Sequence, residues 1–356
     1  MIRGLNVFFA RAIYALSWFY LAPEIPELIF RFHEPQTFSG LIPLSFFLGS
    51  GIMQLPAAFV GSKIGQRNSL VLGLVIMSAS SFLLSVAWNF NLLLLFYALG
   101  GVGASFFFSS GGAIISSLNK ERVSLALGLY NSLFCVGGIV GLNWGVVDEY
   151  LGFSLGSVAV GVLTLLSALL NLRLPNNSSS WSSVKNRRVL ILGLSTAGVW
   201  GVYYAVGELF PSFLVFYQHG ELLTSSAVTS LLLLFSAIGG SLGGLGDRLN
   251  RMKLLLVSSV LTSLSPLLLY TPAYVLGLAI LGISNEMAIS VLYSMVALEG
   301  GVVNSSVTLA EVNSLNIFFG TWLEFLAGFL GFSAWIALSV AGLLPLLLLL
   351  TLRNRT

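Results

Sequence analysis

The sequence predicts an all-α membrane protein with twelve transmembrane helices, arranged as two related halves of six. Only 8% of the 356 residues are charged and 56% are hydrophobic, whereas a soluble domain carries about 25% charged residues. No Asp, Glu, Lys, Arg or His occurs from Asn68 to Asn119, or from Leu254 to Asn285. Because one span needs about 20 residues, each of these runs holds two helices and a turn. The natural solvent of the chain is therefore lipid.

Helices rather than strands are expected throughout, because the apolar stretches exceed the length of strands and lack alternation. A helix also satisfies its own backbone hydrogen bonds, as lipid demands. Polar or turn-forming residues at 88–91 and 270–272 separate neighbouring spans. We expect spans near residues 5–26, 36–60, 68–88, 92–117, 122–146, 152–172, 189–217, 223–245, 253–270, 273–297, 306–329 and 333–352.

Basic residues predict the orientation, since Lys and Arg on short loops resist translocation. With the N-terminus inside, all Lys and Arg residues fall on inner segments except Arg31, which is outside, and Arg11, which lies within the first span. The net charge of +3 is thus an orientation signal and does not indicate a nucleic-acid partner. We expect a multi-pass protein of the cytoplasmic membrane, with both termini cytoplasmic.

The two halves of the chain resemble each other at a nearly constant offset. Asn131-Ser132-Leu133 recurs as Asn313-Ser314-Leu315, and the basic turn at 61–67 recurs at 246–251. A polar Ser- and Asn-rich segment divides the two copies. We expect a first bundle over 1–174, a cytoplasmic linker over 175–188 and a second bundle over 189–356. Parallel repeats of this kind place a shared cavity near the midplane, which indicates alternating access.

With this organisation, the chain resembles the major facilitator superfamily of secondary transporters. The turns after spans two and eight are similar to the family's G-x-x-x-D-R-x-G-R loop, although Ser62 replaces the acid in the first copy. The resemblance implies that these loops help to latch a cytoplasmic gate; plain inner-loop positive charge is the alternative. The gate residues implied are Lys63, Gly65, Arg67, Asp247, Arg248 and Arg251.

A second resemblance lies in span five, where Gly137-x-x-x-Gly141-Leu142-x-x-Gly145 is similar to a glycine signature of antiporters. Leu142 replaces the proline of that signature. Glycines at this spacing also allow two helices to approach closely whatever the function. In span four, Tyr97 stands where drug–proton exporters typically carry an arginine, which argues against a direct assignment to that group.

Ionisable groups at bilayer depth are costly and usually face a cavity or a partner. Glu286, beside Asn285, lies near the middle of span ten, and we hypothesise that it is the proton-coupling acid. A neutral acid bonded to a neighbouring helix is the alternative. Arg11 either binds an anionic group in the cavity, neutralises an acid, or extends to the inner interface. Glu208 is expected at the outer interface.

Five uncharged polar residues complete the candidate cavity: Asn131, Asn285, Asn313, Tyr203 and Tyr204. Asn131 and Asn313 hold equivalent places in the two halves and could bind substrate or bond to a neighbouring helix. Tyr203 and Tyr204 could form aromatic walls. Trp88 and Trp335, near span ends, are expected to be interfacial anchors.

The sequence lacks metal-ligand spacing and a phosphate-binding Gly-x-x-x-x-Gly-Lys-Ser/Thr loop, so we expect no metal, no cofactor and no enzyme activity. We expect a monomeric secondary transporter of a small organic solute, neutral or singly charged. Proton-coupled export is favoured over uptake by symport or uniport. A receptor or scaffold of the same fold that does not transport is the alternative class.

Overall fold

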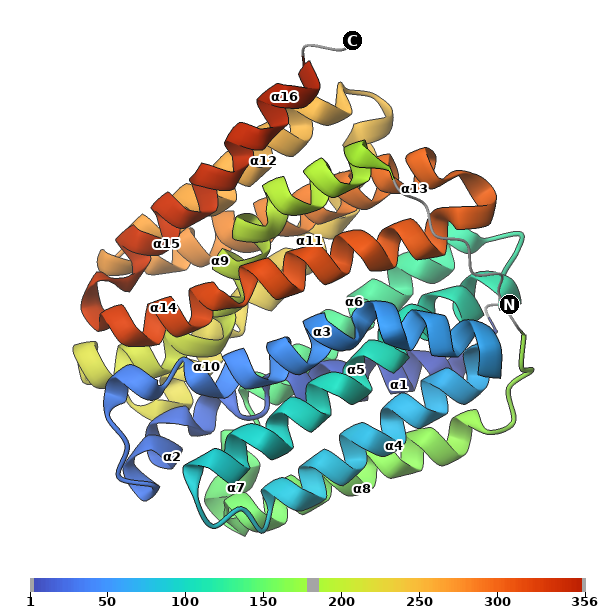
Figure 1. The fold of residues 1–356 in the computed structure, drawn as a ribbon. Coiled ribbons are helices and arrows are strands. Elements are labelled where there is room, and N and C mark those ends of the chain that lie inside the picture. The colour runs from blue at the N-terminus through green and yellow to red at the C-terminus, as the bar shows by residue number, and fades with distance from the viewer. Residues whose placement is uncertain (1–2, 178–185, 354–356) are drawn as a thin grey trace.

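The computed structural model describes residues 3–177 and 186–353, and all regular secondary structure within them is helical (Figure 1). The helices of the first half are α1 (Leu5–Phe19), α2 (Ile25–Arg31), α3 (Leu41–Ile64), α4 (Gln66–Leu84), α5 (Phe90–Leu118), α6 (Val123–Leu142), α7 (Gly145–Leu151) and α8 (Phe153–Asn171). Those of the second half are α9 (Arg187–Gln218), α10 (Leu222–Thr229), α11 (Leu231–Leu242), α12 (Arg251–Leu264), α13 (Tyr274–Gly320), α14 (Trp322–Leu330), α15 (Ala334–Leu343) and α16 (Leu350–Arg353). Short 3-10 turns connect or extend them: η1 (Ala22–Glu24), η2 (Gln36–Phe38), η3 (Gly243–Asp247), η4 (Ser265–Tyr270), η5 (Gly331–Ser333) and η6 (Leu344–Leu349).

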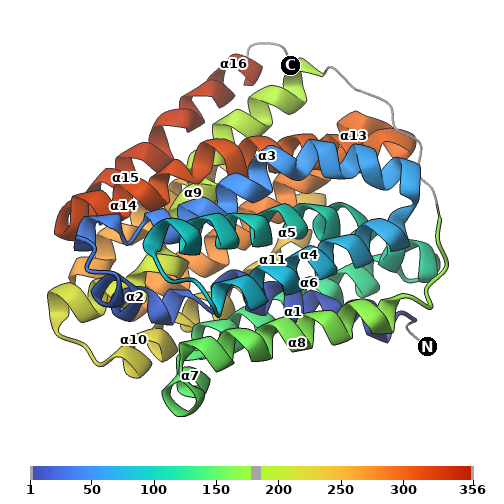
Figure 2. The ribbon, with the colours of Figure 1, turned by 60° about the horizontal axis from the view of Figure 1, so that its bottom comes forward.

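The bundle has two ends, which we name by their position relative to the chain termini. The start of α1, the end of α8, the start of α9 and the end of α16 lie at one end, the terminal face (Figures 1 and 2). Helices α2, α7 and α10 lie at the other end, the opposite face. Most of the predicted linker, residues 178–185, lies outside the described residues, so the linker boundaries stay a prediction.

The predicted count of twelve spans is confirmed. Among the described residues, ten stretches are long and apolar enough to cross a membrane, and α6 with α7, bent by 40°, forms an eleventh. The last stretch, residues 307–352, is 46 residues long, which is about twice one span. It reverses at Gly331, whose φ of 54° suits glycine. Accordingly, Trp335 packs on Phe213 near the end of α9, whereas Leu349 clusters with Val189 near its start.

Helix α13 contains two of these spans. The Tyr293 hydroxyl donates to Asn313 Oδ1 over 2.9 Å, although 20 residues separate them in sequence. A straight helix of that length would put them about 30 Å apart. The arms 274–296 and 307–320 therefore lie side by side, as the two predicted spans at 273–297 and 306–329 require.

Close glycine packing repeats in the two halves. A Cβ atom added to Gly137 of α6 would lie 1.9 Å from the carbonyl oxygen of Ala12 in α1. A Cβ atom added to Gly201 of α9 would lie 2.2 Å from the carbonyl oxygen of Gly320 in α13. The first span thus packs on the fifth and the seventh on the eleventh, which matches the internal repeat of the sequence.

The two halves touch each other from the middle of the bundle to the opposite face. Ser314 Oγ donates to the Gly51 carbonyl over 3.1 Å, and Asn143 Nδ2 donates to Ser230 Oγ over 3.2 Å. At the start of α3, a Cβ atom on Gly40 would meet the Glu324 carbonyl oxygen at 2.1 Å. These contacts close the opposite face of the molecule.

Candidate functional site

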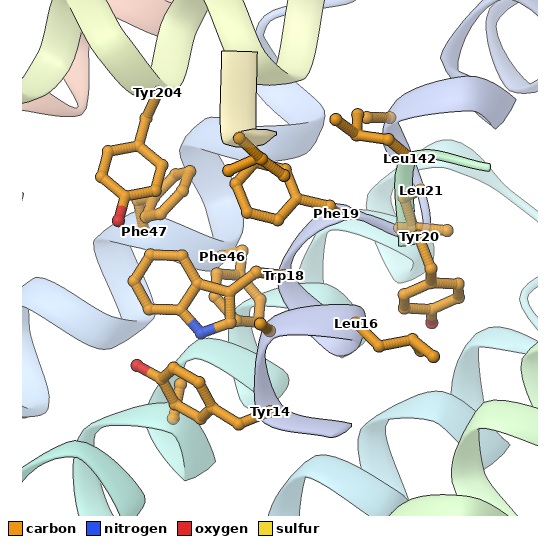
Figure 3. Packing of buried hydrophobic residues seen from close by; sticks show 14 of the residues in the cluster. Tyr14, Leu16, Trp18, Phe19, Tyr20, Leu21, Phe46, Phe47, Leu142 and Tyr204 are labelled. Carbon is orange, nitrogen blue, oxygen red and sulfur yellow. The ribbon is translucent and has the colours of Figure 1, made fainter. Parts of the chain in front are cut away.

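An aromatic cluster at the centre of the bundle joins the two halves (Figure 3). Trp18 of α1 lies 5.3 Å from the Tyr14 ring, 5.0 Å from Phe47 of α3 and 5.4 Å from Tyr204 of α9, measured between ring centroids. Figure 3 shows the hydroxyl groups of Tyr14 and Tyr204 pointing to the same side of the Trp18 indole. Elements of both halves therefore build one wall of aromatic rings and phenol hydroxyls.

Arg11 lies beside this wall, three residues before Tyr14 and so on the same face of α1. Its guanidinium carbon is 4.6 Å from the ring centroids of Tyr130 and Phe134 and 5.0 Å from that of Tyr14. The side chain is only 7% exposed, and its Nε and Nη1 atoms have no hydrogen-bond partner. This position disfavours an extension to the interface. It leaves a buried cation surrounded by rings, whose guanidinium group interacts with the Tyr130 hydroxyl and whose Nε and Nη1 donors are open to an anionic group.

Glu286 of α13 faces Arg11 from the second half. The residue is partly exposed although it lies midway along a span, and its carboxyl group interacts electrostatically with Arg11, Tyr203, Tyr204 and Tyr293. Within the part of the chain that the structure describes, the single ion pair closer than 4 Å is Arg188–Glu299. The charges on Arg11 and Glu286 therefore approach each other across the two halves without a direct ion pair.

The predicted asparagines have different environments. Asn313 is buried and accepts the hydrogen bond from Tyr293, and Asn285 is buried with its Oδ1 atom unpartnered. Asn131 is exposed. It shares a face of α6 with Gly138, seven residues on, where an added Cβ atom would lie 2.6 Å from Leu233 of the second half. Asn131 thus points toward the second half, and the two sequence-equivalent amides are not equivalent in structure.

The two predicted tyrosines also differ. The Tyr203 hydroxyl forms a 2.8 Å hydrogen bond with Ser236 Oγ of α11, which ties it to its own half. Tyr204 belongs to the central wall, with its ring centroid 4.2 Å from that of Trp200. Of this pair, only Tyr204 contacts rings of the first half.

The predicted gate loops lie at the terminal face. Lys63 lies over the ring of Phe59, and Gly65, with a φ of 91°, joins α3 to α4. Arg67 donates from Nη1 to the carbonyls of Leu172 and Leu174 over 3.4 Å, so its bonds stay within the first half. Arg248 is exposed, and Arg251 begins α12; the side chain of Asp247 lies outside the described part of the structure. Their role at a gate stays a prediction.

Several central residues were not predicted from sequence: Tyr14, Trp18, Tyr130, Tyr293 and Gln54. Gln54 is buried, and neither atom of its amide has a partner. It lies one turn from Gly51, at the contact between the halves. Gln54 could have been identified from the sequence, because it is the one amide side chain in the apolar stretch of α3.

Two predictions about the ends of spans were wrong. Glu208 is 1% exposed instead of interfacial, because α9 is surrounded by neighbouring helices at this level. Trp335, predicted to be an interfacial anchor, is also 1% exposed, since it packs on Phe210 and Phe213. The other predicted anchor, Trp88, is 75% exposed.

A cavity of about 20 Å³, lined by Ser39, Ser212 and Trp335 among others, lies at the opposite face. It is large enough for one water molecule and is remote from Arg11.

A bundle of twelve apolar spans, with polar groups of both halves meeting at its centre, is typical of a membrane transporter. The sequence model of the Major Facilitator Superfamily matches residues 7–310. The chain therefore belongs to this superfamily, and it moves a small solute across a membrane.

Relatives with named functions are distant but cover much of the chain. The probable nitrate transporter NarT of Staphylococcus epidermidis is 21% identical, over 96% of this chain and 93% of that protein. A probable sugar efflux transporter of Mannheimia succiniciproducens is 25% identical, over 82% and 78%. The quinolone resistance protein NorA of Staphylococcus aureus is 23% identical over a shorter region, 40% of this chain and 37% of that protein.

Two solved structures share the fold. A bacterial homolog of the human lysosomal transporter Spinster, inward-facing and unoccupied, superposes with a TM-score of 0.73 and 16% identity, covering 96% of this chain and 91% of that one. The nucleoside transporter NupG gives a TM-score of 0.78 with 12% identity, covering 98% of both chains. The predicted fold class is confirmed by these likenesses.

Proposed function

We propose that this protein is a secondary active transporter of a small organic solute, and that Glu286 carries a coupling proton during alternating access. One observation carries the proposal: Glu286, a partly exposed residue midway along a span, interacts electrostatically with Arg11 of the other half. Export in exchange for protons is favoured, because the α6 glycines resemble an antiporter signature and the names of two relatives state efflux or resistance. Uptake by symport or uniport is the alternative.

The physical basis is the cost of moving an unpaired charge through the bilayer. An ionised carboxylate in a low-dielectric site costs several kcal/mol unless it is paired or hydrogen-bonded. Glu286 faces the titratable groups of Arg11 on α1, Cys135 on α6, Tyr203 and Tyr204 on α9, and Tyr293 on its own helix. Arg11 is the one cation among them. A proton or a bound solute can therefore neutralise Glu286 while the halves change their relative orientation.

The test uses Glu286→Gln protein reconstituted in liposomes with an imposed pH gradient. The solutes assayed are nitrate, sugars and quinolones, the classes named for the relatives. We expect gradient-driven accumulation to be lost while counterflow exchange of the same solute continues, because the amide preserves the shape of the site but cannot release a proton. Glu149→Gln, on exposed α7, is the matched control and should behave like the unmodified protein. Normal accumulation by the Glu286→Gln protein would remove Glu286 from the coupling mechanism.

We also propose that the terminal face is cytoplasmic, so that the closed opposite face lies outside. Lys63, Arg67 and Arg188 lie at the terminal face, whereas Glu27 and Glu149 lie at the opposite face. This distribution supports the proposal through the bias of basic residues to inner loops. A fluorescent protein fused to the C-terminus should fluoresce, and alkaline phosphatase fused there should be inactive. An active phosphatase fusion would reverse the assigned orientation.

A further inference from the structure

We propose that the central site takes a zwitterionic solute, with its carboxylate on Arg11, its ammonium group on Glu286 and an aromatic or apolar body against the ring wall. This inference rests on the proposed function, because it assigns the solute class for the same site. It is argued from the two charges, which belong to different halves, and from the groups that surround each of them.

The anionic end of the solute is defined by Arg11. Its Nε and Nη1 atoms are buried without hydrogen-bond partners, and three aromatic rings surround its guanidinium group. A guanidinium group presents parallel N–H donors that match the two oxygens of a carboxylate. An ammonium group of the solute would be repelled at this position.

The cationic end is defined by Glu286 and the rings of α9. No ion pair joins Glu286 to a cation within 4 Å in the described residues, and the residue is partly exposed. The faces of Tyr204 and Trp18, 5.4 Å apart, lie between the two halves close to these charges. An ammonium group gains from a carboxylate and from aromatic faces together, by ion pairing and cation–π attraction.

Counting charges discriminates among solute classes. With Arg11 and Glu286 ionised, the fixed charge of the site is zero, but each charge lacks a direct partner. A solute with one charge neutralises one of them and leaves the other desolvated, which is costly. A zwitterion neutralises both. Its ammonium group also competes with a proton for the Glu286 carboxylate, so solute binding and proton release are linked in the sense that exchange transport requires.

The experiment compares three probes that share one benzyl side chain: phenylalanine as the zwitterion, phenylalaninamide as the cation and N-acetylphenylalanine as the anion. Binding to purified protein is followed by quenching of tryptophan fluorescence, since Trp18 and Trp200 flank the site. We expect phenylalanine to bind at least about tenfold more tightly than either single-charge probe, because each leaves one buried charge unpaired.

The variants then assign each end of the solute. Arg11→Gln should remove the preference for phenylalanine over phenylalaninamide, whereas Glu286→Gln should remove the preference over N-acetylphenylalanine. Arg31→Gln is the matched control, because Arg31 also lies over rings, those of Phe32 and Phe153, but is exposed at the opposite face. It should leave the ranking of the three probes unchanged.

The ranking with unmodified protein decides the question even where a variant fails to fold. Tightest binding of the anion or of the cation, or no discrimination among the probes, would overturn the zwitterion assignment. If none of the probes binds but Glu286→Gln still abolishes gradient-driven transport of another solute, the proposed function stands and the solute class is wrong. If phenylalanine binds as expected but its transport does not depend on the pH gradient, the zwitterion assignment stands and the proposed proton coupling is wrong.

Discussion

At the scale of single residues, Tyr97 shows what a substitution in a family pattern can mean structurally. It occupies the position in span four where drug–proton exporters typically carry an arginine. Here its buried hydroxyl donates over 2.7 Å to the carbonyl oxygen of Trp18, at the centre of the aromatic wall. The residue therefore ties α5 to the backbone of α1 where the candidate site is built.

We expect Tyr97→Phe to lower the stability of the protein by about 1 kcal/mol, the usual net value of one buried hydrogen bond. Thermal unfolding in detergent measures the loss. Tyr150→Phe is the control, because the Tyr150 side chain is 83% exposed and its loss should change little. Equal melting temperatures for Tyr97→Phe and the unmodified protein would show that the bond contributes nothing measurable.

At the scale of helices, the glycine series of span five has a direct packing role. Gly137 and Gly141 of α6 lie against the carbonyl oxygens of Ala12 and Leu16, where added Cβ atoms would approach to 1.9 and 2.9 Å. The carbonyl of a helix cannot rotate away from such a contact. The spacing therefore sets how closely α1 approaches α6, and with it the depth of Arg11 between them.

We expect Gly137→Ala to destabilise the protein by about 1–3 kcal/mol, because the two helices must separate to admit the methyl group. Gly128→Ala is a matched change in the same helix, since nothing lies within 4 Å of its added Cβ atom. Thermal unfolding of both variants in detergent compares them. A Gly137→Ala protein as stable as Gly128→Ala would contradict the close α1–α6 contact.

At the scale of the whole molecule, closure of the opposite face depends on a few backbone contacts between the halves. Gly40 and Gly328 lie so close that a Cβ atom on Gly328 would be 2.4 Å from the Gly40 nitrogen. Contacts of this kind exist only while the halves are closed on that side. A substitution there should raise the energy of the closed state without touching the open one.

We expect Gly40→Ala to shift the population toward opening at the opposite face. A penalty of about 1.4 kcal/mol gives a tenfold change in the equilibrium. The readout is labelling of Ser212→Cys, buried in the closed state, by a membrane-impermeant maleimide in a Cys135→Ser background. Gly240→Ala, with nothing within 4 Å, is the control. Unchanged labelling in the Gly40→Ala protein would show that this contact does not hold the face closed.

Sequence reasoning singled out the charged members of the candidate site more readily than its uncharged members. Arg11 and Glu286 stood out because each interrupts a long apolar run, and the structure places them near each other. Tyr14 and Trp18 did not, because aromatic residues are 12% of the chain and most positions look alike. Asn131 and Asn313 occupy equivalent positions in the sequence repeat, but their environments differ. Asn131 is exposed, whereas Asn313 accepts a hydrogen bond from Tyr293.

The sequence by itself determined that the chain is a lipid-embedded helical bundle of twelve spans in two related halves. Hydropathy, loop charge and repeats depend only on the order of residues, so they can be read along the chain. Only the tertiary structure decided which side chains face one another: Arg11 toward Glu286, Tyr203 toward Ser236, and Glu208 into the surrounding helices. The rotation of an almost uniformly apolar helix is set by the helices packed against it, and that information is not contained in its own residues.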